Sequence, residues 1–336
     1  MSNWYMSSKN ENDVVISTRI RLARNLSGIP FPARMTAEQR QQLNLRVKQA
    51  VDKCNTPVTS QLKYIEMDTV PDHEIKAMVE RHIISPEFAA DIKDRAILLN
   101  NDETICVMIG EEDHLRIQVI MGGMELESAY NTACELERLL DVDLNFAFDE
   151  RLGYITSCPT NLGTGLRASV MLHLPILESY KEVASLSDYI RKIGFTVRGI
   201  YGEGSKAKAS MYQISNQITL GIDEKTALDN LKVIAMQIVE KERERRRDFD
   251  KIRLEDIVWR AYATLKHQRI LSSEEMLTLV SRIKLGQSMG ILDIDADLPL
   301  QILIQGQPFM LMRRFGTMTP DERDIKRAET VRKMLE

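Results

Sequence analysis

Three short runs rich in valine, isoleucine and leucine follow one another closely in the chain, at residues 96–100, 104–109 and 115–121. Clusters of asparagine, aspartate and glutamate separate the runs, which is typical of turns between neighbouring strands. Together they predict a meander of consecutive antiparallel strands. The rest of the chain must extend this sheet or pack on it, so the predicted fold class is α+β.

Helical signals flank these strands. Thr36 and Gln39 form a capping box that predicts a helix through residue 53, and residues 126–140 predict another. A further helix ends at residue 192, where Gly194 stops it. Strand character returns at residues 195–200 and 211–220, around a loop at 201–209. The predicted architecture is a mainly antiparallel sheet flanked by helices.

The character of the chain changes near residue 223. Helices are predicted at residues 228–251, 254–266 and 272–284. A last helix begins at Thr319, where Pro320 and Glu322 complete an N-terminal capping pattern. We therefore expect two domains: an α+β domain of residues 1–248 and a helical domain of residues 249–336.

Composition argues against several classes of protein. The 336 residues carry a net charge of −4, which argues against a general nucleic-acid binder. No apolar run approaches the length needed to cross a bilayer, and the N-terminus has no hydrophobic signal core. Widely spaced cysteines without a CxxC pair predict reduced thiols in a cytoplasmic protein. We expect three of them to be buried and the fourth, Cys158, to be functional; the other three are Cys54, Cys106 and Cys134.

The segment SCPTNLGTGLRASVMLHLP, residues 157–175, places Cys158, a proline, two glycines and Arg167 together. The glycines predict a tight turn. The pattern alone leaves two interpretations open. One is a turn that leads into a helix beside an ordinary buried thiol, and the other is a site that handles charge.

Arginines form a second pattern. In the segment STRIRLARN, residues 17–25, Arg19 and Arg21 would share one face of a strand because the side-chain period is two. Two adjacent guanidinium groups repel one another unless an anion lies between them, and phosphate oxygens suit their planar geometry. For this segment alone, a pair of ordinary surface arginines is the alternative.

Three more arginines lie beside turns rich in glycine or acidic residues: Arg116 after EEDH, Arg167 after NLGTG and Arg198 before GIYGEGS. The five arginines together predict a distributed clamp for a nucleoside triphosphate. The chain has no GxxxxGKS/T loop and no kinase set of Gly-rich loop, HRD and DFG. Arginine side chains would therefore replace a P-loop backbone.

These segments carry a family resemblance. In chain order, STRIRLARN, EEDHLR, CPTNLGTGLRASV and VRGIYGEGS resemble the signature segments of the ATP:guanido phosphotransferases, the family of creatine and arginine kinases. The resemblance covers roughly residues 14–248. It implies a phosphagen-kinase-like catalytic domain that transfers the γ-phosphoryl group of ATP to a guanidinium nitrogen.

Within this family, the resemblance is strongest to the bacterial protein-arginine kinases of the McsB type. The STRIR segment begins at Ser17, so we expect the helical domain that encloses small substrates in phosphagen kinases to be missing. An active site without that lid would admit an arginine attached to a protein. RDIKRA, residues 323–328, matches the RDxxRA motif of this branch. Alone, that segment would be a charged helix face.

The resemblance implies roles for the matching residues. Glu112 matches the catalytic glutamate, although Glu111 stays open as a competitor for the role of base. Glu203 matches a second glutamate, in a mobile loop between two glycines. Cys158 would tune the guanidinium site as a thiolate, without a covalent intermediate. The catalytic residues are expected to be Glu112, Glu203, Cys158, Arg116, Arg167 and Arg198.

The resemblance also implies two binding sites. The NLGTG turn would bring backbone amides close to the nucleotide, and Mg²⁺ would bridge the phosphates, with no protein ligand identified. The nucleotide-binding residues are expected to be Ser17, Thr18, Arg19, Ile20, Arg21, His82, Arg116, Arg167, Ala168, Ser169, Val170, Met171, Arg198, Gly199, Ile200, Tyr201, Gly202 and Glu203. The RDIKRA motif implies a regulatory phosphoarginine pocket of Arg323, Asp324, Arg327 and Ala328.

The implied activity is that of a protein-arginine kinase, with ATP and Mg²⁺, that marks proteins for ClpC–ClpP degradation and inactivates the heat-shock repressor CtsR. The implied partners are proteins with exposed arginines, CtsR, the zinc-containing activator McsA and the ClpC chaperone, without direct contact to nucleic acid or membrane. We also expect an allosteric, cytoplasmic stress-response enzyme that forms a homo-oligomer. The alternatives are a kinase of free arginine or another small guanidino compound, and a catalytically silent adaptor.

Overall fold

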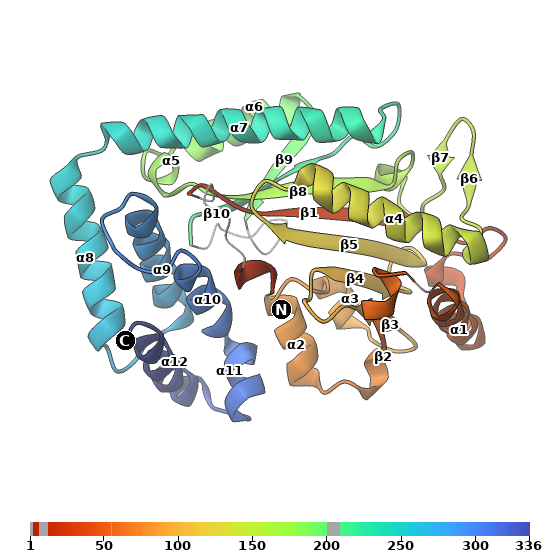
Figure 1. Cartoon of the computed structure of the whole chain (residues 1–336), viewed down its shortest axis with the longest axis horizontal. Helices are drawn as coiled ribbons and strands as arrows, with labels where there is room; N and C mark the ends of the chain where they lie inside the picture. Colours follow the sequence, from red (N-terminus) through yellow and green to blue (C-terminus); the bar gives the residue numbers. More distant parts are fainter. Residues whose placement is uncertain (1–2, 7–12, 55, 200–208) are drawn as a thin grey trace.

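One eight-stranded sheet runs through the molecule (Figure 1). The computed structural model describes residues 3–6, 13–54, 56–199 and 209–336. The strand order is β2-β3-β4-β5-β1-β8-β10-β9, and all of these pairings are antiparallel. The meander predicted from the sequence is confirmed as β3, β4 and β5, and the α+β fold class is confirmed with it. The strands are β1 (Val15–Arg24), β2 (Lys63–Glu66), β3 (Ala96–Leu99), β4 (Ile105–Ile109), β5 (Leu115–Gly122), β8 (Leu166–His173), β9 (Phe195–Gly199) and β10 (Met211–Asn216), and a separate hairpin contains β6 (Phe148–Asp149) and β7 (Gly153–Tyr154).

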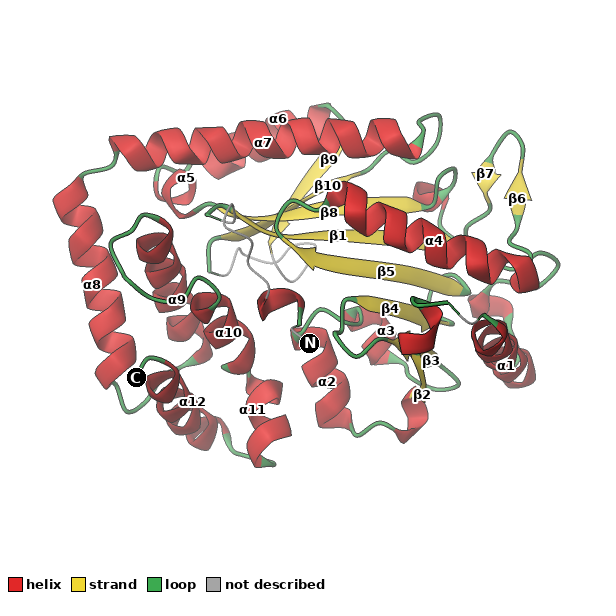
Figure 2. Cartoon of the chain, in the orientation of Figure 1, coloured by secondary structure: helices red, strands yellow, loops and turns green. Residues whose placement is uncertain are grey.

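Helices flank the sheet, and residues 249–336 contain helices and their connections alone (Figure 2). The capping boxes predicted at Thr36 and Thr319 are both present. The longer helices of the first part are α1 (Ala37–Lys53), α2 (Asp72–Glu80), α3 (Pro86–Ala90), α4 (Leu126–Leu144), α5 (Pro175–Ser179), α6 (Glu182–Lys192) and α7 (Glu224–Asp248). The C-terminal helices are α8 (Lys251–His267), α9 (Ser273–Ser288), α10 (Leu298–Gln305), α11 (Pro308–Phe315) and α12 (Pro320–Met334).

The two faces of the sheet differ in chemistry. One face buries aliphatic side chains of β1, β5 and β8 against α1, α4 and α7, and Figure 1 shows α4 and α7 lying along the strands. Ile20 and Leu22 belong to this core and are fully buried. Because side chains alternate along a strand, Arg19 and Arg21 project from the opposite face. The C-terminal helices pack on the side of that second face.

One open interpretation and two predicted boundaries are settled by the structure. The interpretation in which the turn leads into a helix is wrong, because residues 166–173 form strand β8 between β1 and β10. The helix predicted at 228–251 ends at Asp248, since the Asp250 side chain accepts the Arg253 N–H and caps the start of α8. The strand predicted at 211–220 ends at Asn216.

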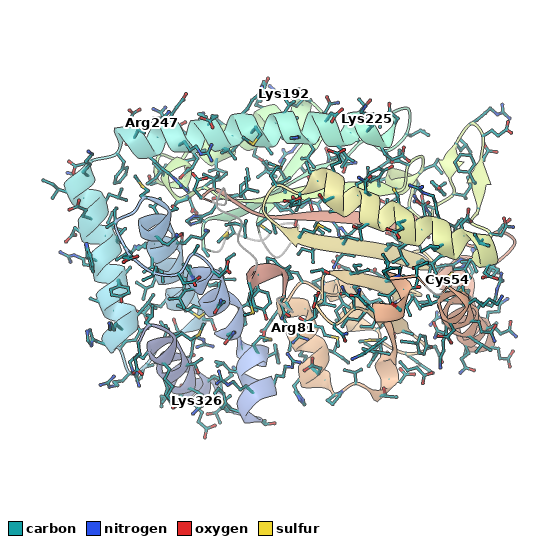
Figure 3. All side chains as sticks on the ribbon, in the orientation of Figure 1. Cys54, Arg81, Lys192, Lys225, Arg247 and Lys326 are labelled. Atoms are coloured by element: carbon teal, nitrogen blue, oxygen red, sulfur yellow. The ribbon has the colours of Figure 1, made fainter. Side chains whose placement is uncertain are left out.

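All four cysteines are free thiols, as predicted, but Cys54 is half-buried rather than buried. It is the residue that follows the last turn of α1 (Figure 3), where its Sγ lies 3.6 Å from the Leu139 carbonyl oxygen. Cys106 and Cys134 are buried, and Cys158 is half-buried.

The C-terminal helices dock on the first part through α2 and β8. The Glu80 carboxylate accepts the N–H groups of Phe309 and Met310 at the start of α11, at 3.0 and 2.9 Å. His173 of β8, fully buried, lies 2.8 Å from the Ser281 hydroxyl of α9. Charged and polar contacts therefore fix how α9 to α11 lie against the sheet.

A buried ion pair joins β1 to α4. The Arg24 Nε donates to the Glu137 carboxylate at 2.6 Å, and Nη1 donates to the carbonyls of Ala23 and Thr164 at 2.7 and 3.1 Å. The guanidinium also lies 3.4 Å from the centre of the Tyr154 ring. A single side chain therefore holds the strand, the helix and the segment before β8 in one arrangement.

Replacing Arg24 by methionine is expected to lower the free energy of unfolding by about 3–5 kcal/mol, because Glu137 would keep a buried charge without its partner. The double variant Arg24→Met/Glu137→Leu should recover most of that loss. Urea unfolding followed by circular dichroism measures both. The exposed pair Arg260–Asp256 is the matched control, and Arg260→Met should cost less than about 1 kcal/mol. Equal losses in the two single variants would contradict this role for Arg24.

Candidate active site

The five predicted arginines lie on one face of the sheet. Arg21 of β1 is directly opposite Arg167 of β8, Arg116 of β5 is opposite Ala23, and Arg198 of β9 is opposite Gln213 of β10. Opposed residues of an antiparallel pair project to the same side. The register therefore gathers all five arginines, from β1, β5, β8 and β9, into one cluster opposite the aliphatic core.

Two guanidinium groups of β1 lie partly out of water among like charges. Burial, and the nearby Arg116 and Arg167, lower the pKa of Arg19 to about 10. Burial, and the nearby Arg19, Arg116 and Arg167, likewise hold the pKa of Arg21 well below its usual value. Arg19 donates to the Gln213 side chain at 2.6 Å, whereas Arg21 has no hydrogen-bond or ion-pair partner within the described part of the chain. Such a cluster is suited to bind a polyanion.

The turn between β4 and β5 brings carboxylates to one end of this cluster. Glu111 is nearly buried, with a side chain 6% exposed, and its oxygens lie 2.8 Å from both the Arg116 guanidinium and the Ser85 hydroxyl. The Glu112 side chain is 42% exposed and lies 3.7 Å from Arg116. Glu112 is therefore the freer of the two carboxylates.

The next residue of the same turn positions the cysteine loop. Asp113 accepts the Asn25 amide at 2.6 Å and the Ser157 backbone N–H at 2.7 Å. These bonds fix the residue before Cys158, whose Sγ lies 3.0 Å from the Thr160 hydroxyl. Asn161 of the same loop lies 3.5 Å from Glu112. The structure thus brings Glu112 and the Cys158 loop together, as the family motifs predict.

The glycines of NLGTG serve close packing. Gly163 has φ +108°, and a Cβ there would lie 2.1 Å from the Thr219 carbonyl oxygen. Gly165 has φ +60°, and a Cβ there would lie 2.7 Å from the Ala23 carbonyl oxygen. The turn is confirmed, but three of its amides already donate within the protein: those of Asn161, Leu162 and Thr164 bind the carbonyls of Cys158, Pro159 and Thr219. Those three amides are not oriented to a nucleotide.

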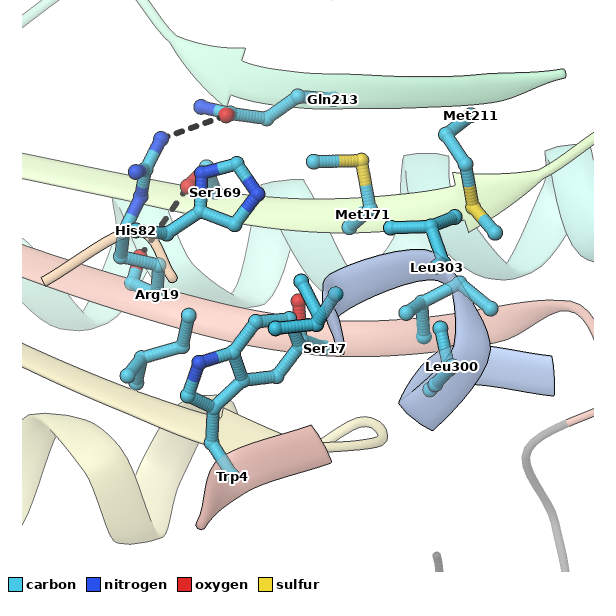
Figure 4. A pocket seen from close by; sticks show the side chains of 13 residues that line it. Trp4, Ser17, Arg19, His82, Ser169, Met171, Met211, Gln213, Leu300 and Leu303 are labelled. Atoms are coloured by element: carbon cyan, nitrogen blue, oxygen red, sulfur yellow. Dashed lines mark hydrogen bonds between the residues drawn. The ribbon is translucent and has the colours of Figure 1, made fainter. Parts of the chain in front are cut away.

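A small cavity lies at the other end of the arginine face, lined by both parts of the chain (Figure 4). His82 lies beside Arg19 there, and burial together with the Arg19 charge lowers the pKa of His82 to about 3. The Trp4 indole donates to the Arg81 carbonyl at 3.0 Å and its ring centre lies 6.0 Å from that of His82. The lining residues that complete the cavity include Ser17, Ser169, Met171, Met211, Leu300 and Leu303.

Other predicted residues lie elsewhere. Thr18, Ile20, Ala168 and Val170 project to the aliphatic face, so they shape the strands rather than line the cluster. Gly199 ends β9. The four residues that follow it in the predicted site lie outside the described part of the chain: Ile200, Tyr201, Gly202 and Glu203.

The RDIKRA segment forms part of α12. Arg327 is buried, donates to the carbonyls of Gly306 and Leu271 at 2.7 Å each, and forms an ion pair with Asp324. The Asp324 side chain remains 29% exposed. Among the residues that the structure describes, the Arg323 side chain contacts the Met312 sulfur at 3.9 Å, and Ala328 is fully buried. Arg327 therefore supports the segment, and Arg323 and Asp324 are the groups left to meet a ligand.

Sequence reasoning missed several residues of the site. Asp113 has no predicted role in the EEDH segment, and Asn25 is only the last residue of STRIRLARN, yet the two bind one another beside the Cys158 loop. Gln213 and Trp4 carried no local signal, because their partners Arg19 and Arg81 lie 194 and 77 residues away in sequence. Within the described residues, no three histidine, cysteine or acidic side chains group as a metal site, and no helix is long and apolar enough to cross a membrane.

Two family profiles match the chain. The ATP:guanido phosphotransferase C-terminal catalytic domain matches residues 42–245, and the protein-arginine kinase McsB C-terminal domain matches residues 251–336. A relative named protein-arginine kinase from Halothermothrix orenii is 45% identical over 340 residues, which is 100% of this chain and 97% of the relative. Another of that name, from Caldanaerobacter subterraneus, is 42% identical over 97% of this chain and 98% of the relative.

Solved structures give the same fold. The duplicated taurocyamine kinase from Schistosoma mansoni with bound transition-state analogue components has a TM-score of 0.62 and 28% identity, over 71% of this chain and 34% of that chain. Lombricine kinase has a TM-score of 0.63 over 73% of this chain and 70% of that chain, at 22% identity, and so supports the fold alone.

Removing one cation from the crowded face should stabilise the ligand-free protein. Arg21→Met is expected to raise the free energy of unfolding by about 1–3 kcal/mol, because a desolvated charge among like charges is lost. The same variant should lose most of the thermal stabilisation that inorganic tripolyphosphate gives the parent protein. Thermal unfolding with and without tripolyphosphate measures both effects, with Arg260→Met as the control. A variant that is less stable and still responds fully to tripolyphosphate would contradict this assignment.

Proposed function

The chain belongs to the ATP:guanido phosphotransferases, and within them to the protein-arginine kinases, and on that premise we propose that its arginine face binds the phosphates of ATP while Glu112 receives the target arginine. The observation that carries this proposal is Arg21, a half-buried side chain whose Nε is shielded from water and whose guanidinium has no acceptor among the described residues. Phosphate oxygens are the acceptors that such a group fits best. When bound together with the nucleotide, Mg²⁺ would supply further charge neutralisation.

The reaction requires help for the nucleophile. A guanidinium has a pKa near 13.8, so presenting it in the neutral form at pH 7 costs about 9 kcal/mol. Glu112 orients this group and accepts its proton as the nitrogen attacks. A P–N bond forms, the P–O bond to the leaving ADP breaks, and the proton goes to the Glu112 carboxylate. Glu111 suits this role less well, since Arg116 and Ser85 already bind its oxygens.

The arginines stabilise the group in transfer. Arg116 lies between the two glutamates, and Arg21 and Arg167 stand one step further along the sheet. Guanidinium groups fixed by strands cost little reorganisation when charge develops on the phosphoryl oxygens. Arg19 and Arg198 hold the phosphates nearer the cavity, with His82, Ser17 and Met171 beside the nucleotide.

Cys158 and Glu203 complete the proposed guanidinium site. Asp113 and Asn25 position the Cys158 loop, so that Cys158 contacts the guanidinium without a covalent intermediate. Glu203, as the second carboxylate, would grip the other edge of the planar group. Its role rests on the family motif, because it lies outside the described residues.

The cellular role is proposed from the relatives. The chain marks proteins for ClpC–ClpP degradation, inactivates CtsR, is activated by McsA, and acts as a homo-oligomer in the cytoplasmic stress response. Four free thiols fit a reducing compartment. Residues 1–248 and 249–336 are proposed as the catalytic and regulatory domains.

The regulatory pocket is proposed on α12. Arg323 would bind the phosphate of a phosphoarginine and Asp324 its guanidinium. The proposal is supported by Arg327, which forms an ion pair with Asp324 and is itself fixed by hydrogen bonds to two backbone carbonyls.

With Mg-ATP and an unfolded, arginine-rich protein, the enzyme is expected to form acid-labile phosphate on that protein. Glu112→Gln should reduce the rate by at least about 100-fold, because the variant keeps the shape of the side chain but cannot accept the proton. Phosphorus NMR and acid lability identify the product. Glu66→Gln, exposed on β2, is the matched control and should keep full activity.

Free arginine in the same assay separates the alternatives. Phosphate on free arginine alone would indicate a kinase of small guanidino compounds. ATP binding without transfer to either substrate, even with the activator present, would indicate an adaptor. Either result would overturn the proposed activity.

Asp324→Ala is expected to abolish the effect of free phosphoarginine on the rate of protein phosphorylation, because the guanidinium of the ligand loses its counter-ion. The rate without phosphoarginine should stay within about twofold, since the segment lies outside the arginine cluster. Asp321→Ala, in the exposed first turn of the same helix, is the control. An unchanged response to phosphoarginine in Asp324→Ala would rule out this pocket.

A further inference from the structure

Exposed apolar side chains gather around the loop that carries Cys158. Phe148 and Leu152 belong to the β6–β7 hairpin and are 60% and 44% exposed. Ile218 and Leu220 belong to the connection from β10 to α7 and are 51% and 49% exposed. We call these four residues the apolar rim. None of them takes part in the site described above.

Beneath the rim, three separate backbone segments pack against one another. Gly153 of the hairpin packs on Gly163, where a Cβ would lie 2.4 Å from the Gly163 oxygen. Gly163 in turn packs on Thr219 and on the Cα of Leu220. The Phe148 ring contacts the Tyr154 ring of the same hairpin, with centres 5.2 Å apart.

Hydrogen bonds connect these segments to Glu112, the proposed base. The Thr219 hydroxyl donates to the carbonyls of Thr160 and Leu162 at 3.0 and 2.7 Å. These residues flank Asn161, which lies 3.5 Å from Glu112. Figure 1 shows the β6–β7 hairpin at the end of the sheet where β8 begins and β1 ends. The rim therefore borders the end of the arginine face at which the guanidinium is received.

The length of an arginine side chain determines which parts of a substrate protein can contact the apolar rim. Standard bond lengths put the guanidinium roughly 6 Å from its Cα. When the guanidinium of a target arginine contacts Glu112, the backbone of the substrate must therefore lie within about that distance of Glu112. In an extended segment, residues two to four positions away lie roughly 7–14 Å along the chain. Side chains that flank the target arginine must then lie over the surface around Glu112.

We propose that the apolar rim binds apolar side chains that flank the target arginine in an extended segment of the substrate protein. This inference rests on the proposed function, because it takes Glu112 as the point where the guanidinium enters. Single exposed apolar residues such as Val142 and Ile252 are ordinary, but four on adjoining loops beside a reactive centre mark a contact surface. Folded proteins bury most of their large apolar residues. The rim therefore selects arginines in unfolded segments.

The test compares two short peptides with one central arginine, flanked either by leucine and phenylalanine or by serine. The parent enzyme should phosphorylate the first with a kcat/KM about fivefold to tenfold higher, mainly through a lower KM, as expected for burial of one or two apolar side chains. The variant Phe148→Ser/Leu220→Ser should lose this preference and keep its rate on the serine-flanked peptide within about twofold. Val142→Ser/Ile252→Ser, which removes two still more exposed apolar residues away from the rim, should keep the preference.

Each outcome has one meaning. Equal kcat/KM for the two peptides with the parent enzyme overturns the rim, whatever the variants do, and does not depend on whether they fold. A preference that survives in Phe148→Ser/Leu220→Ser, with thermal unfolding unchanged, also overturns it. Failure of the parent enzyme to phosphorylate either peptide, or the unfolded protein, contradicts the proposed function itself.

Discussion

Repulsion among like charges is the constraint on which the rest of this structure depends. Five arginines share one face of a sheet, where burial and the neighbouring arginines lower the pKa of both Arg19 and Arg21. The antiparallel register leaves no freedom to turn these side chains away, because a one-residue shift would move the aliphatic residues of the opposite face into water. The apolar core under α1, α4 and α7 therefore offsets the electrostatic cost of the charged face. Natural active sites often keep such unfavourable groupings for their ligands.

The proposed reaction follows the direction of the strands. Ser17 and His82 border the cavity at one end, and Glu112 with the Cys158 loop stands at the other. From Ser17 to Arg21 the β1 strand rises by roughly 13 Å, a length suited to an extended triphosphate. A nucleotide laid along this path would bring its terminal phosphoryl group to the guanidinium end. Rigid strands, rather than a glycine-rich phosphate loop, fix the positions of the charged groups.

Local patterns in the sequence predicted the parts of the fold that local interactions determine. The alternation in β3 to β5, the shared face of Arg19 and Arg21, and the capping boxes at Thr36 and Thr319 depend only on neighbours in sequence. The segment of β8 stays ambiguous in the sequence because a short apolar run after a turn suits a buried helix as well as a buried strand. The role of Asp113 depends on Asn25 and Ser157, 88 and 44 residues away, and only the folded register brings them together. The cavity residues of α10 could not be foreseen for the same reason.

Helix α10 contributes Leu300 and Leu303 to the wall of a cavity whose other walls include β1, β8, β10 and the Trp4 turn. A molecule bound there would touch the sheet and the C-terminal helices at once. Because binding equilibria are reciprocal, any change that stabilises the docking of α9 to α11 must then raise the affinity for that molecule. The bound molecule must in turn stabilise the docking by the same factor. The hydrogen bonds between Glu80 and the first amides of α11 therefore contribute to the affinity of the cavity for its ligand, although Glu80 does not line the cavity.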